Sequence, residues 1–194
     1  MVVVISNPTP VKDELSIIHQ LFGEGLEVFH LRKKDYPESE VRKIIEKIPE
    51  KYFGKIVLHS HYYLTADYKL KGIHVPDSFK NKTITGAVST SFHSLEEMKN
   101  ARAKFEYAFL SPVFDSISKV GYKSKLDLKE IKEFLKNRSD KIVALGGIDE
   151  DKVDAVKDAG FSGVALLGSI WQNENPVAKY KGIAEKWGRK QLAY

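Results

Sequence analysis

The chain has 194 residues, 42% of them hydrophobic, and a formal net charge of +5 at pH 7. It contains no cysteine, which excludes disulfide bridges, thiolate metal sites and cysteine nucleophiles and fits a reducing cytoplasm. Its apolar runs are shorter than the roughly 18 residues that span a bilayer, and Val2–Ile5 follows no basic leader. We therefore expect one domain over residues 1–194, unexported and cytoplasmic, without membrane contact.

Basic residues are spread along the exposed sides of the predicted helices, and the sequence carries no RNA-binding or helix-turn-helix signature. This distribution indicates a solvated basic surface, and we expect no nucleic-acid partner. The same positive field attracts small molecules that carry several phosphate charges.

Short runs rich in Val, Ile and Phe alternate with helical patterns along the chain, which is typical of repeated βα units and a parallel sheet. Apolar residues at helical spacing predict helices in Val41–Tyr52 and Leu128–Leu135. Eight strands are predicted, at Val2–Ser6, Leu26–Lys34, Lys55–Ser60, Gly72–Val75, Ile84–Thr90, Tyr107–Val113, Lys141–Gly147 and Gly163–Gly168.

Helix boundaries are marked by residues with strong positional preferences. Ser94 begins a Ser-Leu-Glu-Glu capping box, and Pro37 and Pro176 lie where first turns are expected. Only Pro76–Thr83 separates the fourth strand from the fifth, which is too short for a full crossover helix. The sequence therefore predicts a single (β/α)8 TIM barrel with a shortened fourth βα unit, whose chemistry takes place at the C-terminal strand ends.

The second predicted strand carries three polar residues on one face, because alternation points His30, Arg32 and Lys34 to the same side. In a closed barrel that side faces the interior, where unpaired charge is costly unless an anion compensates it. A phosphate-containing ligand is the simplest such anion.

Two glycine-containing pairs, Gly146-Gly147 and Gly168-Ser169, end the seventh and eighth predicted strands. Glycine lets backbone N–H groups approach an anion closely, and the N-terminus of a following helix favours negative charge. The loops after strands seven and eight form the recurrent phosphate site of this architecture. We therefore expect phosphate binding there, and tight turns are the alternative explanation for the glycines.

Three further groups lie at or near predicted strand ends. The loop Ser111–Lys119 supplies hydroxyls and an ammonium that can converge on phosphate oxygens, or it is an ordinary polar loop. Alternation aims the imidazoles of His59 and His61 the same way, but no third ligand follows them, so a zinc or nickel site is the less favoured interpretation. His74 lies in a short apolar strand and is expected to be a hydrogen-bonded interior group.

One ordered set of segments covers nearly the whole chain, namely His30–Lys34, Gly72–His74, Val88-Ser89, Ser111–Phe114, Ser116–Lys119, Val143–Ile148, Gly163–Ala165 and Gly168-Ser169. In this order and spacing, the chain resembles thiamin phosphate synthase and its thiazole tautomerase relatives, the TenI proteins. The resemblance implies a TIM barrel that binds phosphorylated pyrimidine and thiazole molecules, and a homodimer is a family-level expectation.

In the synthase, 4-amino-2-methyl-5-hydroxymethylpyrimidine diphosphate ionises to a pyrimidine carbocation, which the nitrogen of the thiazole phosphate captures as diphosphate is released. Stabilisation of the departing diphosphate does most of the catalysis. The resemblance implies that Arg32 and Lys34 bind this diphosphate. Ser116, Ser118 and Lys119 stand where the family has a Thr-x-Thr-Lys clamp.

The same resemblance implies the contacts of the two rings. His30 replaces a family glutamine that contacts the pyrimidine, and Ser89 matches a serine near it. Gly147, Leu167 and Gly168 match positions whose backbone N–H groups bind the thiazole phosphate.

The chain departs from the synthase at the magnesium site. The family has Asn-Asp after strand three and an Asp after strand four, whereas this chain has His59-Ser60 and, past Asp77, Phe79. A synthase function therefore implies Mg²⁺ without its usual carboxylates, and the leaving group then needs other stabilisation. The candidates to supply it are Lys33, Lys34, His59, His61 and a displaced Asp77.

The tautomerase relatives use no metal, and a histidine in the loop after strand six moves a proton on a thiazole carboxylate phosphate. That position is Pro112 here, as in the synthase, and His30 and His59 are alternative proton carriers. Three functions therefore stay open. The transferase is favoured first, a tautomerase without a cofactor second, and a non-catalytic binder of thiazole phosphate or thiamin phosphate third.

Overall fold

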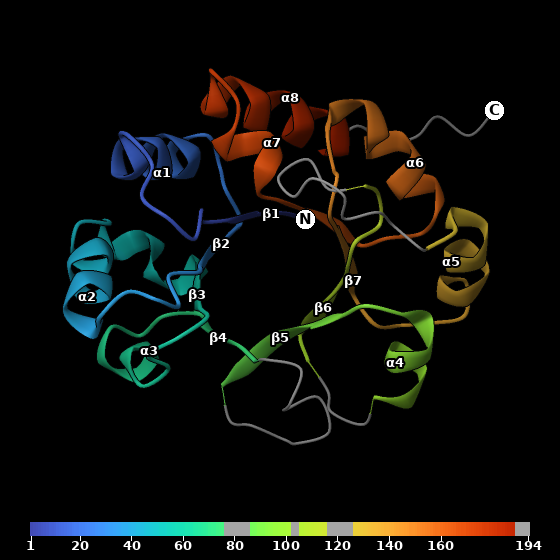
Figure 1. Ribbon diagram of the computed structural model, residues 1–194, viewed down its shortest axis with the longest axis horizontal. Helices are drawn as coiled ribbons and strands as arrows, with labels where there is room; N and C mark the ends of the chain where they lie inside the picture. Colours follow the sequence, from blue (N-terminus) through green and yellow to red (C-terminus); the bar gives the residue numbers. More distant parts are fainter. Residues whose placement is uncertain (76–85, 102–104, 116–125, 189–194) are drawn as a thin grey trace.

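The computed structural model shows a closed barrel of eight parallel strands (Figure 1). It describes residues 1–75, 86–101, 105–115 and 126–188. The strands pair in chain order, and β8 closes the barrel against β1. This arrangement confirms the predicted (β/α)8 barrel. The strands are β1 (Val2–Ile5), β2 (Val28–Leu31), β3 (Ile56–Leu58), β4 (Gly72–His74), β5 (Ala87–Phe92), β6 (Tyr107–Leu110), β7 (Ile142–Leu145) and β8 (Gly163–Leu166).

Helices form an outer ring around the strands (Figure 1). They are α1 (Glu14–Gly23), α2 (Glu38–Glu46), α3 (Leu64–Asp67), α4 (Leu95–Asn100), α5 (Leu128–Leu135), α6 (Val153–Asp158), α7 (Gly168–Trp171) and α8 (Pro176–Gly188), with 3-10 turns η1 (Glu50–Lys55) and η3 (Glu150–Lys152). Within the described ranges, none of these helices has the length and apolar character needed to cross a membrane.

The strands separate two apolar clusters, because alternate side chains of a strand point to opposite faces. Val2 and Val4 belong to the cluster between strands and helices, whereas Val3 and Ile5 belong to the cluster inside the barrel. The other buried members of the interior cluster are Val28, Val57, Val88, Tyr107, Phe109, Val143 and Ala165. The barrel is therefore a packed core rather than a pore, and its polar groups gather toward the C-terminal strand ends.

Local sequence signals explain where the helices begin and end. Ser94 Oγ accepts a hydrogen bond from the Glu97 N–H at 3.0 Å and caps α4, which confirms the predicted capping box. The apolar stripe Val41–Tyr52 is divided between α2 and η1, because Pro49 cannot donate to a continuous helical ladder. Both elements still turn their apolar side chains toward the barrel.

Several strands begin or end at residues other than those that the sequence predicts. Strand β2 ends at Leu31 rather than Lys34, because the Arg32 N–H donates to Ser6 Oγ at 2.8 Å instead of continuing the ladder. Strand β5 runs on to Phe92, where its pairing with β6 ends. The predicted short fourth connection, Pro76–Thr83, lies outside the described residues.

Candidate active site

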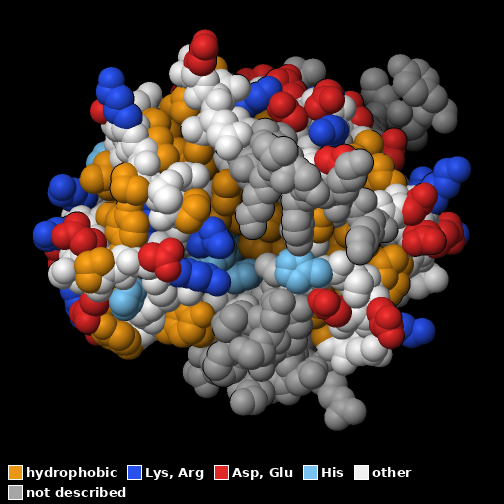
Figure 2. All heavy atoms as spheres, in the orientation of Figure 1, with side chains coloured by type: hydrophobic (Ala, Val, Ile, Leu, Met, Phe, Trp, Pro, Cys, Tyr) orange, Lys and Arg blue, Asp and Glu red, His pale blue; other side chains and the backbone are white. Residues whose placement is uncertain are grey.

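The C-terminal end of β2 places one histidine inside the barrel and two cations at the mouth. His30 is fully buried, Arg32 is half-buried and Lys34 is exposed. Burial, followed by the charges of Lys34 and Arg32, lowers the pKa of His74 to about 3, so both cations lie near that ring. Figure 2 shows Lys and Arg atoms beside histidine atoms near the centre of this face. The polar side chains of this segment therefore gather at one end of the barrel.

Lys33 points toward α1 instead of the mouth. Its Nζ atom lies 2.8 Å from a Glu14 carboxylate oxygen, donates to Thr9 O at 3.3 Å and lies 5.0 Å from the Tyr36 ring centroid. Only 1% of the Lys33 side chain is exposed, compared with 14% of the Glu14 side chain. From the sequence, Lys33 was a candidate to replace magnesium. In the structure its buried ion pair with Glu14 instead connects the segment after β2 to α1.

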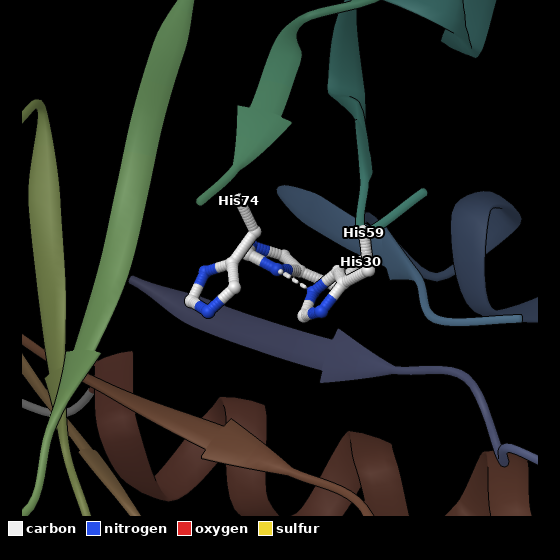
Figure 3. Close-up of side chains that lie close together, drawn as sticks. All are labelled: His30, His59 and His74. Atoms are coloured by element: carbon white, nitrogen blue, oxygen red, sulfur yellow. Dashed lines mark hydrogen bonds between the residues drawn. The ribbon is translucent and has the colours of Figure 1, made fainter. Parts of the chain in front are cut away.

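Three histidines from neighbouring strands meet inside the barrel at its C-terminal end (Figure 3). His30 Nδ1 and His59 Nε2 share a hydrogen bond of 2.8 Å. The rings of His59 and His74 stack with their centroids 4.3 Å apart and an interplanar angle of 15°. One potential metal-ligating nitrogen of each ring lies within 4.8 Å of the other two. We call His30, His59 and His74 the histidine cluster.

Hydroxyl groups make hydrogen bonds to two rings of the histidine cluster, those of His30 and His74. Tyr107 Oη lies 2.5 Å from His30 Nε2, and Ser89 Oγ lies 2.8 Å from His74 Nδ1. Ser91 Oγ makes a longer contact of 3.2 Å with His74 Nε2. Ser89, which the resemblance places near the pyrimidine, is therefore a buried partner of His74 in this structure.

Burial keeps the imidazoles of the histidine cluster uncharged. It is the largest cause that lowers the pKa of His30 and of His59 well below the usual value, and the neighbouring His74 lowers both further. Burial likewise raises the pKa of the Tyr107 hydroxyl. At neutral pH each ring therefore has one N–H donor and one free lone pair.

His61 does not belong to the histidine cluster, so the prediction that His59 and His61 point the same way is wrong. Strand β3 ends at Leu58, and His61 has a φ of 50°, which interrupts the alternation. The Nε2 atom of His61 lies 2.9 Å from Tyr36 O. His74 lies beside His59 in space but on the next strand of the chain, so the residues around His59 give no sign of it. The expectation that His74 is a hydrogen-bonded interior group is confirmed.

The glycine pair after β7 is required by backbone conformation and close packing. Gly146 and Gly147 have φ values of 98° and 64°, in the region that favours glycine. A Cβ atom on Gly147 would lie 2.2 Å from Asp115 O and 2.7 Å from Phe114 Cβ. The pair therefore lets the loop after β7 pack against the loop after β6, and this explains the glycines independently of any phosphate.

Gly147→Ala is expected to lower the free energy of unfolding by about 2 to 3 kcal/mol, because strain at positive φ adds to overlap with the neighbouring loop. Gly25→Ala is the matched control, since Gly25 has a φ of 89° and no atom within 4 Å of the added Cβ. It is expected to cost about 1 kcal/mol. Urea unfolding of both variants measures the difference, and equal losses would contradict the close packing of the two loops.

The chain turns into α7 directly after β8. Leu167 precedes this helix, and Gly168 and Ser169 begin it in buried positions. The Ser169 Oγ atom is buried and has no hydrogen-bond partner among the described residues. Trp171 Nε1 donates to Ile5 O at 2.7 Å, which fixes the indole as part of the packing. Buried hydroxyls usually have a hydrogen-bond partner, so the Ser169 Oγ atom is a donor that stays available at this strand end.

The remaining predicted site residues are not described by the structure. Ser116, Ser118 and Lys119 lie in the segment 116–125, and Asp77 and Phe79 lie in the segment 76–85, both outside the described residues.

The metal ligands available in the described part of the chain are nitrogen atoms. Across residues 1–75, 86–101, 105–115 and 126–188, the histidine cluster is the only group of three or more His, Cys, Asp or Glu side chains placed to surround an ion. Mg²⁺ prefers oxygen ligands, and no carboxylate is among the buried side chains of these ranges. The described residues therefore do not fit the Mg²⁺ that the resemblance implies.

Comparison with known proteins gives consistent matches along the chain. A family model described as thiamine monophosphate synthase matches residues 2–170. A thiamine-phosphate synthase of Desulfitobacterium hafniense (strain Y51) is 29% identical over 187 residues, which cover 91% of this chain and 90% of that protein. A crystal structure of thiamine phosphate pyrophosphorylase from Bacteroides thetaiotaomicron is 34% identical with a TM-score of 0.82, covering 95% of this chain and 96% of the other. The thiamine phosphate pyrophosphorylase from Pyrococcus furiosus, 16% identical with a TM-score of 0.74, shares the fold.

Proposed function

Since the chain belongs to the thiamine monophosphate synthase family, we propose that it joins 4-amino-2-methyl-5-hydroxymethylpyrimidine diphosphate to 4-methyl-5-(2-hydroxyethyl)thiazole phosphate in thiamin biosynthesis. The bond between the pyrimidine methylene and a diphosphate oxygen breaks, and both of its electrons leave with diphosphate. The thiazole nitrogen then donates its lone pair to the methylene carbon and forms the new C–N bond. The single observation that carries this proposal is the position of Arg32 and Lys34 at the mouth of a family barrel.

Arg32 and Lys34 stabilise the departing diphosphate in this proposal. Negative charge grows on the leaving group as the bond breaks, and cations already fixed at that position stabilise it most effectively. The hydrogen bond from the Arg32 N–H to Ser6 Oγ, 2.8 Å long, holds the backbone at this point. The guanidinium can then offer two parallel N–H donors to phosphate oxygens.

The loop after β6 completes the diphosphate site in this proposal. Ser116 and Ser118 supply hydroxyl donors, and Lys119 supplies a third cation. Family resemblance alone supports these three roles.

The pyrimidine ring contacts the open side of the histidine cluster. His59 and His74 are 6% and 8% exposed, whereas His30 is 0% exposed. His30 therefore acts through the 2.8 Å hydrogen bond that orients His59, rather than by touching the substrate. This assignment makes His59 the contact residue and His30 a positioning residue.

The thiazole phosphate binds between the ends of β7 and β8 in this proposal. The residues concerned are Gly146, Gly147, Leu167, Gly168 and Ser169. The partnerless Oγ of Ser169 supports this assignment, because a phosphate oxygen would accept its hydrogen bond.

A product assay tests the function. Purified protein is mixed with the pyrimidine diphosphate and the thiazole phosphate, and thiamin phosphate and diphosphate are measured together. We expect equal amounts of both products. The reaction is run with Mg²⁺, with Zn²⁺ and with a chelator, which shows whether a metal takes part. Absence of both products under all conditions, while the thiazole phosphate still binds, would contradict the transferase and favour the binding protein.

One observation favours a tautomerase as the second candidate. The histidine cluster contains neutral imidazoles, each with one N–H and one lone pair, so a ring can take up a proton at one nitrogen and give one up at the other without a metal. The corresponding test follows aromatisation of a thiazole carboxylate phosphate by ultraviolet absorption. Activity that His59→Ala abolishes would establish this function, and no aromatisation would exclude it.

A further inference from the structure

We propose that His30, His59 and His74 bind one divalent transition-metal ion, with Zn²⁺ as the best-fitting ion. Each residue comes from a different strand end, and a ligating nitrogen of each lies within 4.8 Å of those of the other two (Figure 3). Three protein ligands and one open position are the arrangement of many catalytic zinc sites. The proposal concerns the metal alone and does not depend on the proposed transferase reaction.

The spacing of the rings is close to that of a tetrahedral site. Zinc–nitrogen bonds of about 2.0 to 2.1 Å place pairs of ligating nitrogens about 3.4 Å apart. The hydrogen-bonded nitrogens of His30 and His59 are 2.8 Å apart, and no pair in the cluster exceeds 4.8 Å. Small rotations of the side chains therefore bring the three nitrogens into position, without moving the strands.

The hydroxyl partners fix which nitrogen faces the ion. Tyr107 Oη lies 2.5 Å from His30 Nε2, so Nδ1 is the His30 nitrogen that faces His59. Ser89 Oγ lies 2.8 Å from His74 Nδ1, which leaves Nε2 with only the 3.2 Å contact to Ser91 Oγ. Metal-binding histidines usually have such a partner on the second nitrogen, because it sets the tautomer and the ring orientation.

The chemistry of the ligands selects the type of ion. Neutral imidazole binds Zn²⁺ and its neighbours in the first transition series, whereas Mg²⁺ and Ca²⁺ prefer oxygen. Three imidazole nitrogens meet here, and no carboxylate is among the buried side chains of the described ranges, so the ligand set favours Zn²⁺.

The open position faces the mouth of the barrel. His59 and His74 keep 6% and 8% exposure whereas His30 has none, and the chain continues from His30 to the half-buried Arg32 and the exposed Lys34 at this end of the barrel. A divalent ion beside two cations makes this end of the barrel strongly positive. The ligand class that suits the open position is therefore an anion with phosphate oxygens.

Isothermal titration of the metal-free full chain with ZnCl₂ tests the site, and Co²⁺ absorption reports tetrahedral nitrogen coordination. We expect one ion per chain and a higher unfolding temperature with Zn²⁺ than with Mg²⁺. His59→Ala is expected to weaken Zn²⁺ binding by about 100-fold or more, since loss of an outer partner alone costs roughly 10- to 100-fold. His61→Ala, which removes a histidine outside the cluster, is expected to bind Zn²⁺ like the unmodified chain.

Two outcomes would overturn the proposal. One is absence of stoichiometric Zn²⁺ binding by the unmodified chain, a measurement that no folding defect of a variant affects. The other is equal Zn²⁺ affinity of His59→Ala and the unmodified chain, which would assign the binding to surface histidines. Zn²⁺ binding without thiamin phosphate formation would support the metal site and contradict only the proposed reaction.

Discussion

Arg32→Ala is expected to lower kcat/KM for thiamin phosphate formation by about 100- to 1000-fold, the size of effect found when one preorganised charge-stabilising donor is removed. Arg32 stands beside the histidine cluster at the mouth, and it is half-buried, so water replaces its guanidinium poorly. The loss should fall mainly on kcat, because the diphosphate gains charge only as its bond to the pyrimidine breaks. Steady-state kinetics with both substrates measure the effect.

Arg42→Ala is the matched control for this prediction. Arg42 lies on α2, outside the barrel, and pairs with Glu38 and with Asp67 at 2.8 Å. It is expected to leave kcat/KM unchanged, since exposed ion pairs contribute little and this arginine is held by its own carboxylate partners on the outer helix. Equal losses in both variants would mean that overall charge, and not the position of Arg32, attracts the substrates.

Lys33→Met is expected to lower the free energy of unfolding by about 3 to 5 kcal/mol at pH 7, the usual cost of breaking a buried ion pair by removing one partner. Methionine retains most of the apolar stem but leaves the Glu14 carboxylate without its cation. Burial already raises the pKa of Glu14, against the opposing hydrogen bond and charge of Lys33. Urea unfolding monitored by fluorescence gives the difference between the two proteins.

A second variant separates the effect of the unpaired Glu14 charge from a simple packing defect at Lys33. The double change Lys33→Met with Glu14→Leu is expected to recover most of the lost stability, since it removes both charges together. Without Lys33, the folded-state pKa of Glu14 rises further above its unfolded value. The single variant's deficit is therefore fully present above this raised folded-state pKa. It shrinks as the pH falls from that pKa toward about 4.5, below which the carboxyl is protonated in both states. A deficit that does not change with pH would contradict this explanation.

The strands and their order were predictable because each one buries both faces. A strand in a parallel barrel needs only a short apolar run, and β7 (Ile142–Leu145) and β8 (Gly163–Leu166) are visible as such runs. The capping box at Ser94 was equally local, since its hydrogen bond joins residues within one turn. Strand ends were less predictable. Strand β2 ends where the Arg32 N–H donates to Ser6 Oγ, and Ser6 is the residue that follows β1, far away in the sequence.

The candidate site was only partly visible in the sequence. Alternation predicted that His30, Arg32 and Lys34 share one face of a strand, but β2 ends at Leu31, so only His30 is placed by the strand and the two cations lie in the segment that follows it. The direction of Lys33 toward Glu14 depends on where α1 packs, and no pattern around Lys33 reports that position.

The sequence by itself determined the eight strands and the barrel they form, because these follow from periodicity within short segments. Only the tertiary structure decided that His30, His59 and His74 form one cluster. The register pairs His30 with Val57 and Leu58 with Ile73, so residues far apart in the chain stand side by side at the strand ends. The physical reason is that a barrel closes through backbone pairing between strands, and the register of that pairing leaves no periodic trace in the sequence.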